Sequence, residues 1–132
     1  MLSATDALDI IYNNKSVAIV GLSPKTDRPS YKVGSFLQEK GYTITPVNPG
    51  CAEVLGQSCA ASLGDLQPGS VDWIDLFVNP VRLMPLVDDI IRLSPKLVWC
   101  QIGVVNDEFN QKLDEAGISY IADKCPKIEW NQ

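Results

Sequence analysis

The segment SVAIVG, residues 16–21, is a short apolar run, rich in β-branched residues, that ends at a glycine. Such a run, without alternation of polar and apolar residues, is typical of a strand buried on both faces of a parallel sheet. A polar loop follows as far as Ser30, which we predict to be the N-cap of a helix that stops at Gly41. The next strand is expected at residues 43–47, so that a helix joins two parallel strands.

The same alternation continues along the chain. Asn79-Pro80 is a helix-start signal, and Pro85 delays the regular helix, so an irregular turn is expected at residues 80–84. Asn106 is predicted to cap a later helix. The pattern predicts an α/β fold of three layers, with a mostly parallel, doubly wound sheet of about five strands. The further expected elements are strands at 71–78, 97–101 and 119–122, a brief strand at 53–56, helices at 5–13, 85–91 and 106–117, and a weak turn or helix at 62–66.

The composition narrows the possible functions. The chain of 132 residues has the length of one ordinary domain, and we expect residues 1–132 to form it. Its 16 acidic and 11 basic residues give a net charge of −5, which argues against nucleic acid or an anionic membrane as partner. It contains no histidine, which excludes phosphohistidine transfer, His-ligated zinc and His-dependent hydrolysis. No signal peptide or membrane span is recognised, so a cytoplasmic location is expected.

The cysteines give no metal or redox motif, because successive cysteines are never closer than eight positions and no CxxC pair exists. Reduced, buried thiols in a cytosolic protein are the expected state. Cys125 is the best candidate nucleophile, since Lys124 and Lys127 flank it and a cation lowers the pKa of a thiol. The alternative is that Cys125 is a buried structural thiol. The four cysteines are Cys51, Cys59, Cys100 and Cys125.

The loop after the first strand has features of a phosphate site. Ligands of doubly wound sheets bind beyond the carboxyl ends of the strands. Gly21 permits close approach of the backbone, and a helix that begins near Ser30 offers N–H groups and a positive dipole end. Lys25, Arg28 and Lys32 add three cations in an otherwise acidic chain. The loop therefore indicates a multiply charged phosphate ligand, and the alternative is an ordinary capped loop with solvated charges.

Nicotinamide dinucleotides fit this loop poorly. Neither a P-loop motif nor the compact GxGxxG fingerprint occurs in the chain. A dinucleotide site also places an acidic residue after the second strand, where this chain has Asn48. Asn48 and Pro49 can form a wall of an adenine or ribose pocket, or they can simply be the turn that ends the strand.

Four motifs occur in order along the chain: GLSP at 21–24, RPSY at 28–31, PVNP at 46–49 and DKC at 123–125. With them the chain resembles the stand-alone CoA-binding domain family and is similar to the amino-terminal domain of the succinyl-CoA synthetase alpha subunit. The resemblance covers roughly residues 14–129. It implies a Rossmann-like fold with CoA lying across the carboxyl edge of the sheet.

The resemblance also implies roles for particular residues. The chain departs from the family pattern at Gly50, where the family often has lysine, at Val78, where it often has arginine, and at Lys124, which replaces arginine. The implied contacts are Gly21, Ser23, Pro24, Lys25, Arg28 and Ser30 with the phosphates, Val47, Asn48 and Pro49 with the adenosine, and Gln101, Ile102 and Gly103 with the pantetheine.

We therefore expect a protein that binds CoA or an acyl-CoA without catalysing a reaction. Succinyl-CoA synthetase needs a second domain and a phosphorylated histidine, and the chain has no histidine. Two alternatives are an NAD(P)-dependent oxidoreductase and a nucleotide-sensing regulatory module, in which the ligand biases association with another copy or with a protein partner.

Overall fold

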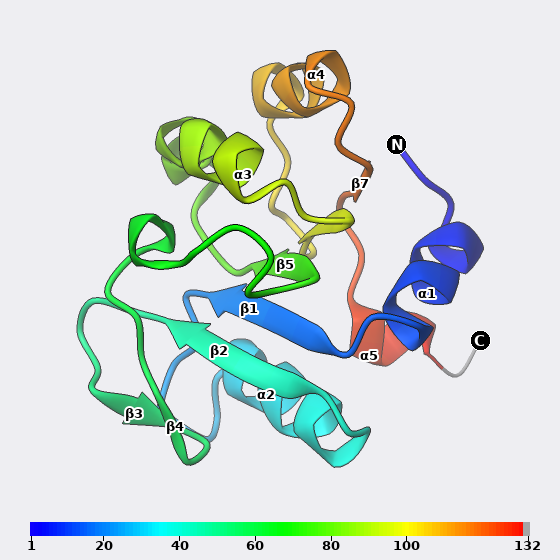
Figure 1. The fold of residues 1–132 in the computed structure, drawn as a ribbon. Helices are drawn as coiled ribbons and strands as arrows, with labels where there is room; N and C mark the ends of the chain where they lie inside the picture. Colours follow the sequence, from blue (N-terminus) through cyan, green and yellow to red (C-terminus); the bar gives the residue numbers. More distant parts are fainter. Residues whose placement is uncertain (131–132) are drawn as a thin grey trace.

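The computed structural model describes residues 1–130 and has a five-stranded parallel sheet at its centre (Figure 1). The strand order is β2-β1-β5-β6-β7, and each neighbouring pair is parallel. The expected Rossmann-like α/β fold is thereby confirmed. The strands are β1 (Ser16–Val20), β2 (Thr43–Val47), β5 (Trp73–Leu76), β6 (Leu97–Cys100) and β7 (Tyr120–Ile121).

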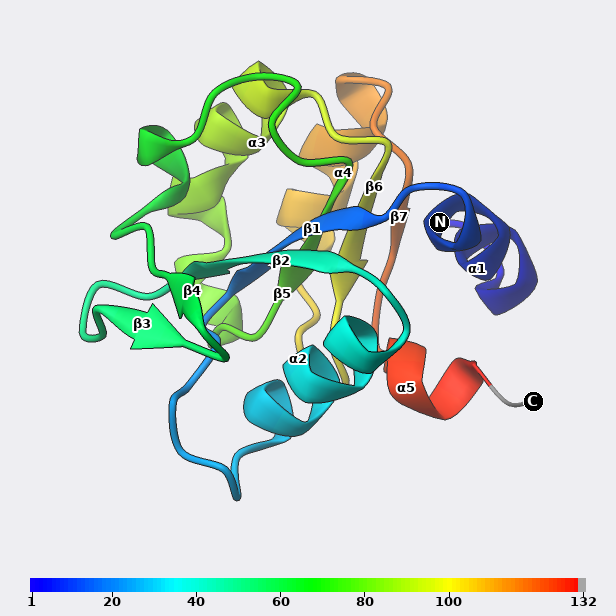
Figure 2. The same cartoon turned by 60° about the horizontal axis from the view of Figure 1, so that its bottom comes forward.

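Helices cover both faces of the sheet, which makes three layers (Figure 2). Helices α1 (Ala4–Tyr12), α2 (Pro29–Glu39) and α5 (Pro126–Glu129) pack on one face. Helices α3 (Val87–Leu93) and α4 (Asp107–Glu115) pack on the other face. None of the helices in residues 1–130 is long and apolar enough to cross a bilayer.

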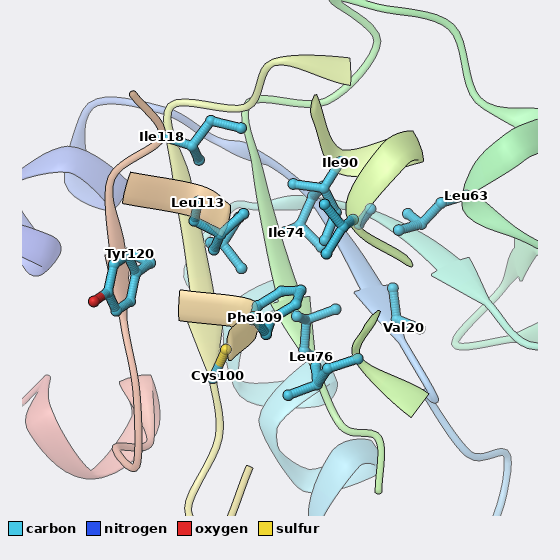
Figure 3. Packing of buried hydrophobic residues seen from close by; sticks show 14 of the residues in the cluster. Val20, Leu63, Ile74, Leu76, Ile90, Cys100, Phe109, Leu113, Ile118 and Tyr120 are labelled. Atoms are coloured by element: carbon cyan, nitrogen blue, oxygen red, sulfur yellow. The ribbon is translucent and has the colours of Figure 1, made fainter. Parts of the chain in front are cut away.

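Alternation along the strands builds two separate cores. Ile74 and Leu76 of β5 face α3 and α4, and Figure 3 shows them against Ile90, Phe109 and Leu113. The intervening strand residues face α1, α2 and α5, where Trp73 and Trp99 are fully buried core residues. Asp75 is a polar exception on that face, and it is also fully buried.

The order of the strands fixes where a ligand would bind. From β1 the chain crosses to β2 on one side, and it later returns to place β5 on the other side of β1. The point between β1 and β5 is therefore the topological switch point, at which ligands of doubly wound sheets bind.

The start of α2 differs from the prediction. The helix begins at Pro29, and its N-cap is Arg28 instead of Ser30. Proline suits the first helical position because its fixed φ matches the helix and it lacks an N–H that would be unpaired there. The hydroxyl of Ser30 instead accepts a hydrogen bond of 3.0 Å from the backbone N–H of Ser23.

A hairpin replaces the brief strand that was expected at residues 53–56. Strands β3 (Glu53–Val54) and β4 (Gln57–Ser58) form an antiparallel pair outside the main sheet. The two residues between them, Leu55 and Gly56, have φ of 53° and 77°, which fits a tight hairpin turn. The expected strand is therefore confirmed at Glu53–Val54 and wrong at residues 55–56, because both turn residues are in the left-handed region.

Short helical turns fill the remaining connections. The weak helix expected at 62–66 is the 3₁₀ turn η1 (Leu63–Asp65). The irregular turn after β5 consists of η2 (Pro80–Arg82) and η3 (Met84–Leu86). Asn106 caps α4 as predicted, since its side chain accepts from the N–H of Phe109 at 3.0 Å. Helix α5 was not expected from the sequence.

The two edges of the sheet are partly covered by other segments of the chain. Ala60 forms a parallel bridge with Val47 at the end of β2. At the opposite edge the N–H of Leu2 donates to the carbonyl of Tyr120 in β7, at 2.8 Å.

Candidate functional site

Two pockets, each of about 500 Å³, lie at the carboxyl edge of the sheet. The first pocket is lined by the ends of β1 and β2, by the segment 61–63 and by residues that follow β5. The second pocket lies between α2, α5 and the residues that follow β5 and β6. Phe77 and Val78 line both pockets, so the two are neighbours across the end of β5.

Gly21 is required by the packing of the strand ends. Its φ is +84°, and a Cβ at this position would clash with the carbonyl oxygen of Phe77. Its N–H donates to the carbonyl of Val47 at 2.9 Å. The glycine therefore joins β1 closely to both neighbouring strands at the switch point, and this gives it a structural reason that is independent of any ligand.

Asn48 holds two loops of the first pocket together. Its side-chain Nδ2 donates to the carbonyl of Leu22 at 2.9 Å, and its Oδ1 accepts from the N–H of Gly50 at 2.9 Å. The loops after β1 and β2 are thus fixed to each other. The wall of the first pocket includes Val47, Asn48 and Pro49, so these three predicted residues lie together.

Arg82 is the cation that sequence reasoning missed in the first pocket. The side chain of Asn79 caps η2 by accepting from the N–H of Val81 at 3.2 Å, and this turn carries Arg82 to the pocket wall. Among residues 1–130 the three ion pairs do not include Arg82. The sequence does contain a signal for Arg82: it is a cation that closely follows Asn79-Pro80, a helix start at the end of a strand.

The segment 61–63 was also missed, because its place depends on contacts between distant elements. Arg92 of α3 donates to the carbonyls of Leu63 and Leu66, at 3.0 and 2.9 Å. The guanidinium also pairs with Asp89, which lines the same pocket. These bonds fix η1 against α3 and so complete the wall of the first pocket.

Gly21 lines the first pocket and Pro29 lines the second, but the rest of the predicted phosphate loop lies outside the walls of both pockets. Internal hydrogen bonds shape it: the N–H of Lys25 donates to Oγ of Ser23 at 3.1 Å, and the N–H of Arg28 donates to the carbonyl of Lys25 at 3.1 Å. The loop projects beyond the sheet in Figure 2, and Pro24, Lys25 and Arg28 are exposed. In the described part of the chain, no side chain caps α2 and no ion pair engages these cations.

The second pocket is mostly apolar. Helix α2 contributes Pro29 and Val33 to the wall of this pocket. Ile102 and Ile128, which also line the pocket, are exposed. The polar side chain on its wall is the amide of Gln101. Gln101 and Ile102 therefore lie together as predicted. Gly103 does not line the pocket, and its N–H donates to the carboxylate of Asp123 at 2.8 Å.

Asp75 lies beneath the second pocket and was not predicted as a site residue. Its Oδ1 accepts a hydrogen bond of 2.6 Å from Nε2 of Gln101, while its Oδ2 has no partner among the described residues. Burial raises the pKa of Asp75 to about 7, although the bond from Gln101 acts in the opposite direction. An acidic residue in the apolar run VDWIDLFV, residues 71–78, was the sequence signal for it.

Cys125 lines the second pocket but is poorly suited to act as a nucleophile. Its exposed fraction is 8%, and burial raises the pKa of its thiol, while the N–H groups of Ile128 and Lys127 act against that shift. A thiol with a raised pKa is protonated at neutral pH. The structure therefore favours the alternative of a buried structural thiol. No three His, Cys, Asp or Glu side chains in residues 1–130 gather as metal ligands.

Comparison with known proteins identifies the family. The family model of the CoA binding domain matches residues 15–131. The chain belongs to the CoA binding domain family. The resemblance that the four motifs suggested is thereby confirmed, and it extends over almost the whole chain.

Relatives of this CoA binding domain protein differ in length. The uncharacterized protein YneT of Bacillus subtilis (strain 168) is 34% identical over 126 residues, which cover 96% of this chain and 93% of YneT. The structure of a hypothetical protein from Pyrococcus horikoshii OT3, 38% identical, matches with a TM-score of 0.91 over 98% of this chain and 91% of that one. The ADP-forming acetate–CoA ligase II of Archaeoglobus fulgidus is 33% identical over 84 residues, which are 62% of this chain but 12% of the ligase.

Proposed function

We propose that the chain binds CoA or an acyl-CoA without catalysing a reaction, with the adenosine in the first pocket and the pantetheine in the second. The observation that carries the proposal is that both pockets share Phe77 and Val78 at the switch point of a CoA binding domain. A ligand with two halves can occupy both by crossing the end of β5. CoA has a polar nucleotide half and a less polar pantetheine half.

The first pocket suits the nucleotide half. Apolar side chains of Val20, Val47 and Leu63 offer surface to a base, and Asn79 offers an amide. Arg82 supplies a cation without an ion-pair partner in residues 1–130, and a guanidinium binds phosphate in a bidentate manner. The exposed cations of the loop 22–28 and the uncapped start of α2 supply further positive charge for the phosphates.

The second pocket suits pantetheine and an uncharged acyl group. Its walls are apolar apart from Gln101 and the Cys125 thiol, and no cation lines it to hold the carboxylate of a dicarboxylic acyl group. The amide of Gln101 is held by Asp75, so it lies in a fixed place to bond an amide of the pantetheine arm.

The same site offers little for catalysis. The chain has no histidine, Asp75 is fully buried, and the thiol of Cys125 has a raised pKa. The match to the related acetate–CoA ligase covers only 12% of the length of that enzyme. We therefore propose the ligand of such an enzyme for this chain but not its reaction.

Titration calorimetry with CoA tests the proposal, with dephospho-CoA and NADP as comparison ligands. We expect CoA to bind roughly tenfold more tightly than NADP, which corresponds to about 1.4 kcal/mol. The Arg82→Ala variant should bind CoA roughly tenfold more weakly at low salt, because it loses a charge-assisted hydrogen bond. Lys112→Ala on α4 is the control, since that cation lies outside both pockets. Absence of heat with CoA together with clear binding of NADP would overturn the proposal.

A further inference from the structure

Two of the cysteines lie side by side at the open end of the β3–β4 hairpin. Cys51 precedes β3 and Cys59 follows β4. The ladder pairs Glu53 with Ser58, and the N–H of Cys59 donates to the carbonyl of Ala52 at 2.9 Å, which extends the ladder by one residue. The register therefore places Cys59 opposite Ala52, the residue next to Cys51, so the two cysteines occupy adjacent positions at the open end of the hairpin.

Both side chains pack against the core on the face of α1, α2 and α5, and the two thiols lie close enough to interact. The thiol of Cys51 donates to the carbonyl of Glu53 at 3.0 Å, and the thiol of Cys59 interacts with that of Cys51. Both residues are partly exposed, whereas Cys100 and Cys125 are buried. Among the four cysteines, this pair therefore combines contact with access for a small reagent.

The surroundings of Cys59 favour its protonated thiol form. Burial raises the pKa of Cys59 to about 11, and the contact with Cys51 and the charge of Glu53 act in the same direction. Cys59 is therefore a protonated thiol at neutral pH. The first attack on an oxidant falls to Cys51, and Cys59 is placed to resolve the product.

We propose that Cys51 and Cys59 form a redox-active dithiol that a low-molecular-weight disulfide closes to an intrachain disulfide. In the first step, the thiolate of Cys51 attacks one sulfur of the reagent, RS–SR, and releases one RS⁻. In the second step, Cys59 loses its proton to solvent and attacks the Cys51 sulfur of the mixed disulfide, which releases the second RS⁻. The two protein thiols are oxidised, and the reagent is reduced to two thiols.

The closed form would connect two walls of the first pocket. Asn48 and Pro49 lie just before Cys51, and Ala61 and Ser62 lie just after Cys59. The N–H of Asn48 already donates to the carbonyl of Ala60 at 2.9 Å. A disulfide between positions 51 and 59 would add a covalent link beside this bond. Oxidation of the pair would therefore tie the two walls of the first pocket together.

Oxidised glutathione is the probe for the test, and no CoA is needed, so the result does not depend on the proposed function. We expect the reduced native protein to lose two of its four titratable thiols and its intact mass to fall by two hydrogen atoms without a bound glutathione. Trypsin leaves both cysteines in one peptide, because no lysine or arginine lies between Lys40 and Arg82. Cleavage after Glu53 separates them, and the two fragments should remain joined until a reductant is added.

Single variants complete the test. Cys51→Ser should leave the thiol of Cys59 free, and Cys59→Ser should stop at a mixed disulfide on Cys51. Cys100→Ser and Cys125→Ser are the matched controls and should close the disulfide like the parent. Two mixed disulfides on the parent protein, a link between two chains, or unchanged thiols at 51 and 59 after prolonged exposure would each overturn the proposal.

Discussion

The first and second pockets have the same volume, about 500 Å³ each, but different walls. Turns and loops contribute most of the first pocket and bring Asn79 and Arg82, while Asp89 comes from α3. The second pocket lies between two helices and is nearly apolar. Irregular segments can therefore place polar groups at a strand end, whereas helix faces that also cover the core present apolar side chains. The difference suits a ligand with one charged half and one less polar half.

Gly21→Ala should have the largest effect, because it disturbs the strand ends on which the first pocket depends. The added Cβ would clash with the backbone carbonyl of Phe77 at a position with positive φ, so we expect a loss of about 3–5 kcal/mol in the free energy of unfolding. Gly117→Ala is the control: its φ is also positive, but nothing lies within 4 Å of the added Cβ, and about 1–2 kcal/mol is expected. Urea denaturation measures both, and equal losses would contradict the packing argument.

Asp75 makes the region beneath the second pocket sensitive to pH. Burial raises the pKa of its carboxyl from the ordinary value of 3.8 to about 7 in the folded protein. Between these values the folded state holds the extra proton, so the free energy of unfolding should fall as pH rises from about 4 to about 7, by up to about 4 kcal/mol.

Asp75→Asn should remove this part of the pH dependence, because an amide keeps an acceptor for Gln101 and carries no charge. The measurement is urea denaturation of both proteins at several pH values between 4 and 7. If the difference between the two proteins stayed constant across that range, the carboxyl would not be the titrating group.

Arg28→Ala tests whether the exposed loop assists the first pocket. The side chain is exposed and lies outside both pocket walls, so we expect a smaller loss than for Arg82→Ala, roughly threefold in CoA affinity, and a weaker effect at high salt. Calorimetry at two ionic strengths measures it, and circular dichroism should show an unchanged fold. Unchanged affinity at low salt would move the phosphates away from this loop.

Ile102→Ala should have the smallest effect and should separate the two pockets. Ile102 lines the second pocket and is 60% exposed, so its truncation removes little buried surface, and roughly a twofold loss of CoA affinity is expected. Adenosine 3′,5′-bisphosphate has no pantetheine, and its affinity should not change. A similar loss for both ligands would place Ile102 at the nucleotide.

Local sequence signals were enough for most of the fold. The apolar run at 16–20, the strand at 43–47 and the cap at Asn106 are encoded by neighbouring residues, and the structure confirms them. Local pattern extended the strand at residue 53 through residue 56, because Leu55 is seldom found with positive φ, and it gave no sign of the second strand of the hairpin.

The candidate site was harder to predict because it depends on distant contacts. Of the residues predicted at the strand ends, Val47, Asn48, Gln101 and Ile102 line one or the other pocket. The segment 61–63 reaches the first pocket through the pairing of Ala60 with the end of β2 and through hydrogen bonds from α3, which no local pattern reveals. Ser30 shows the opposite error, since a residue that is typical of an N-cap instead bonds to the loop before the helix.

The covered edges of the sheet bear on how copies of this protein can associate. Pro46 has no N–H to offer at the outer side of β2, and Ala60 already pairs with the end of that strand. At the other edge β7 has two residues, and Leu2 bonds to it. Edges that are short, interrupted or paired resist the addition of a strand from another chain. Any assembly of this protein should therefore use side-chain surfaces and should not extend the sheet, which also lowers the tendency to aggregate.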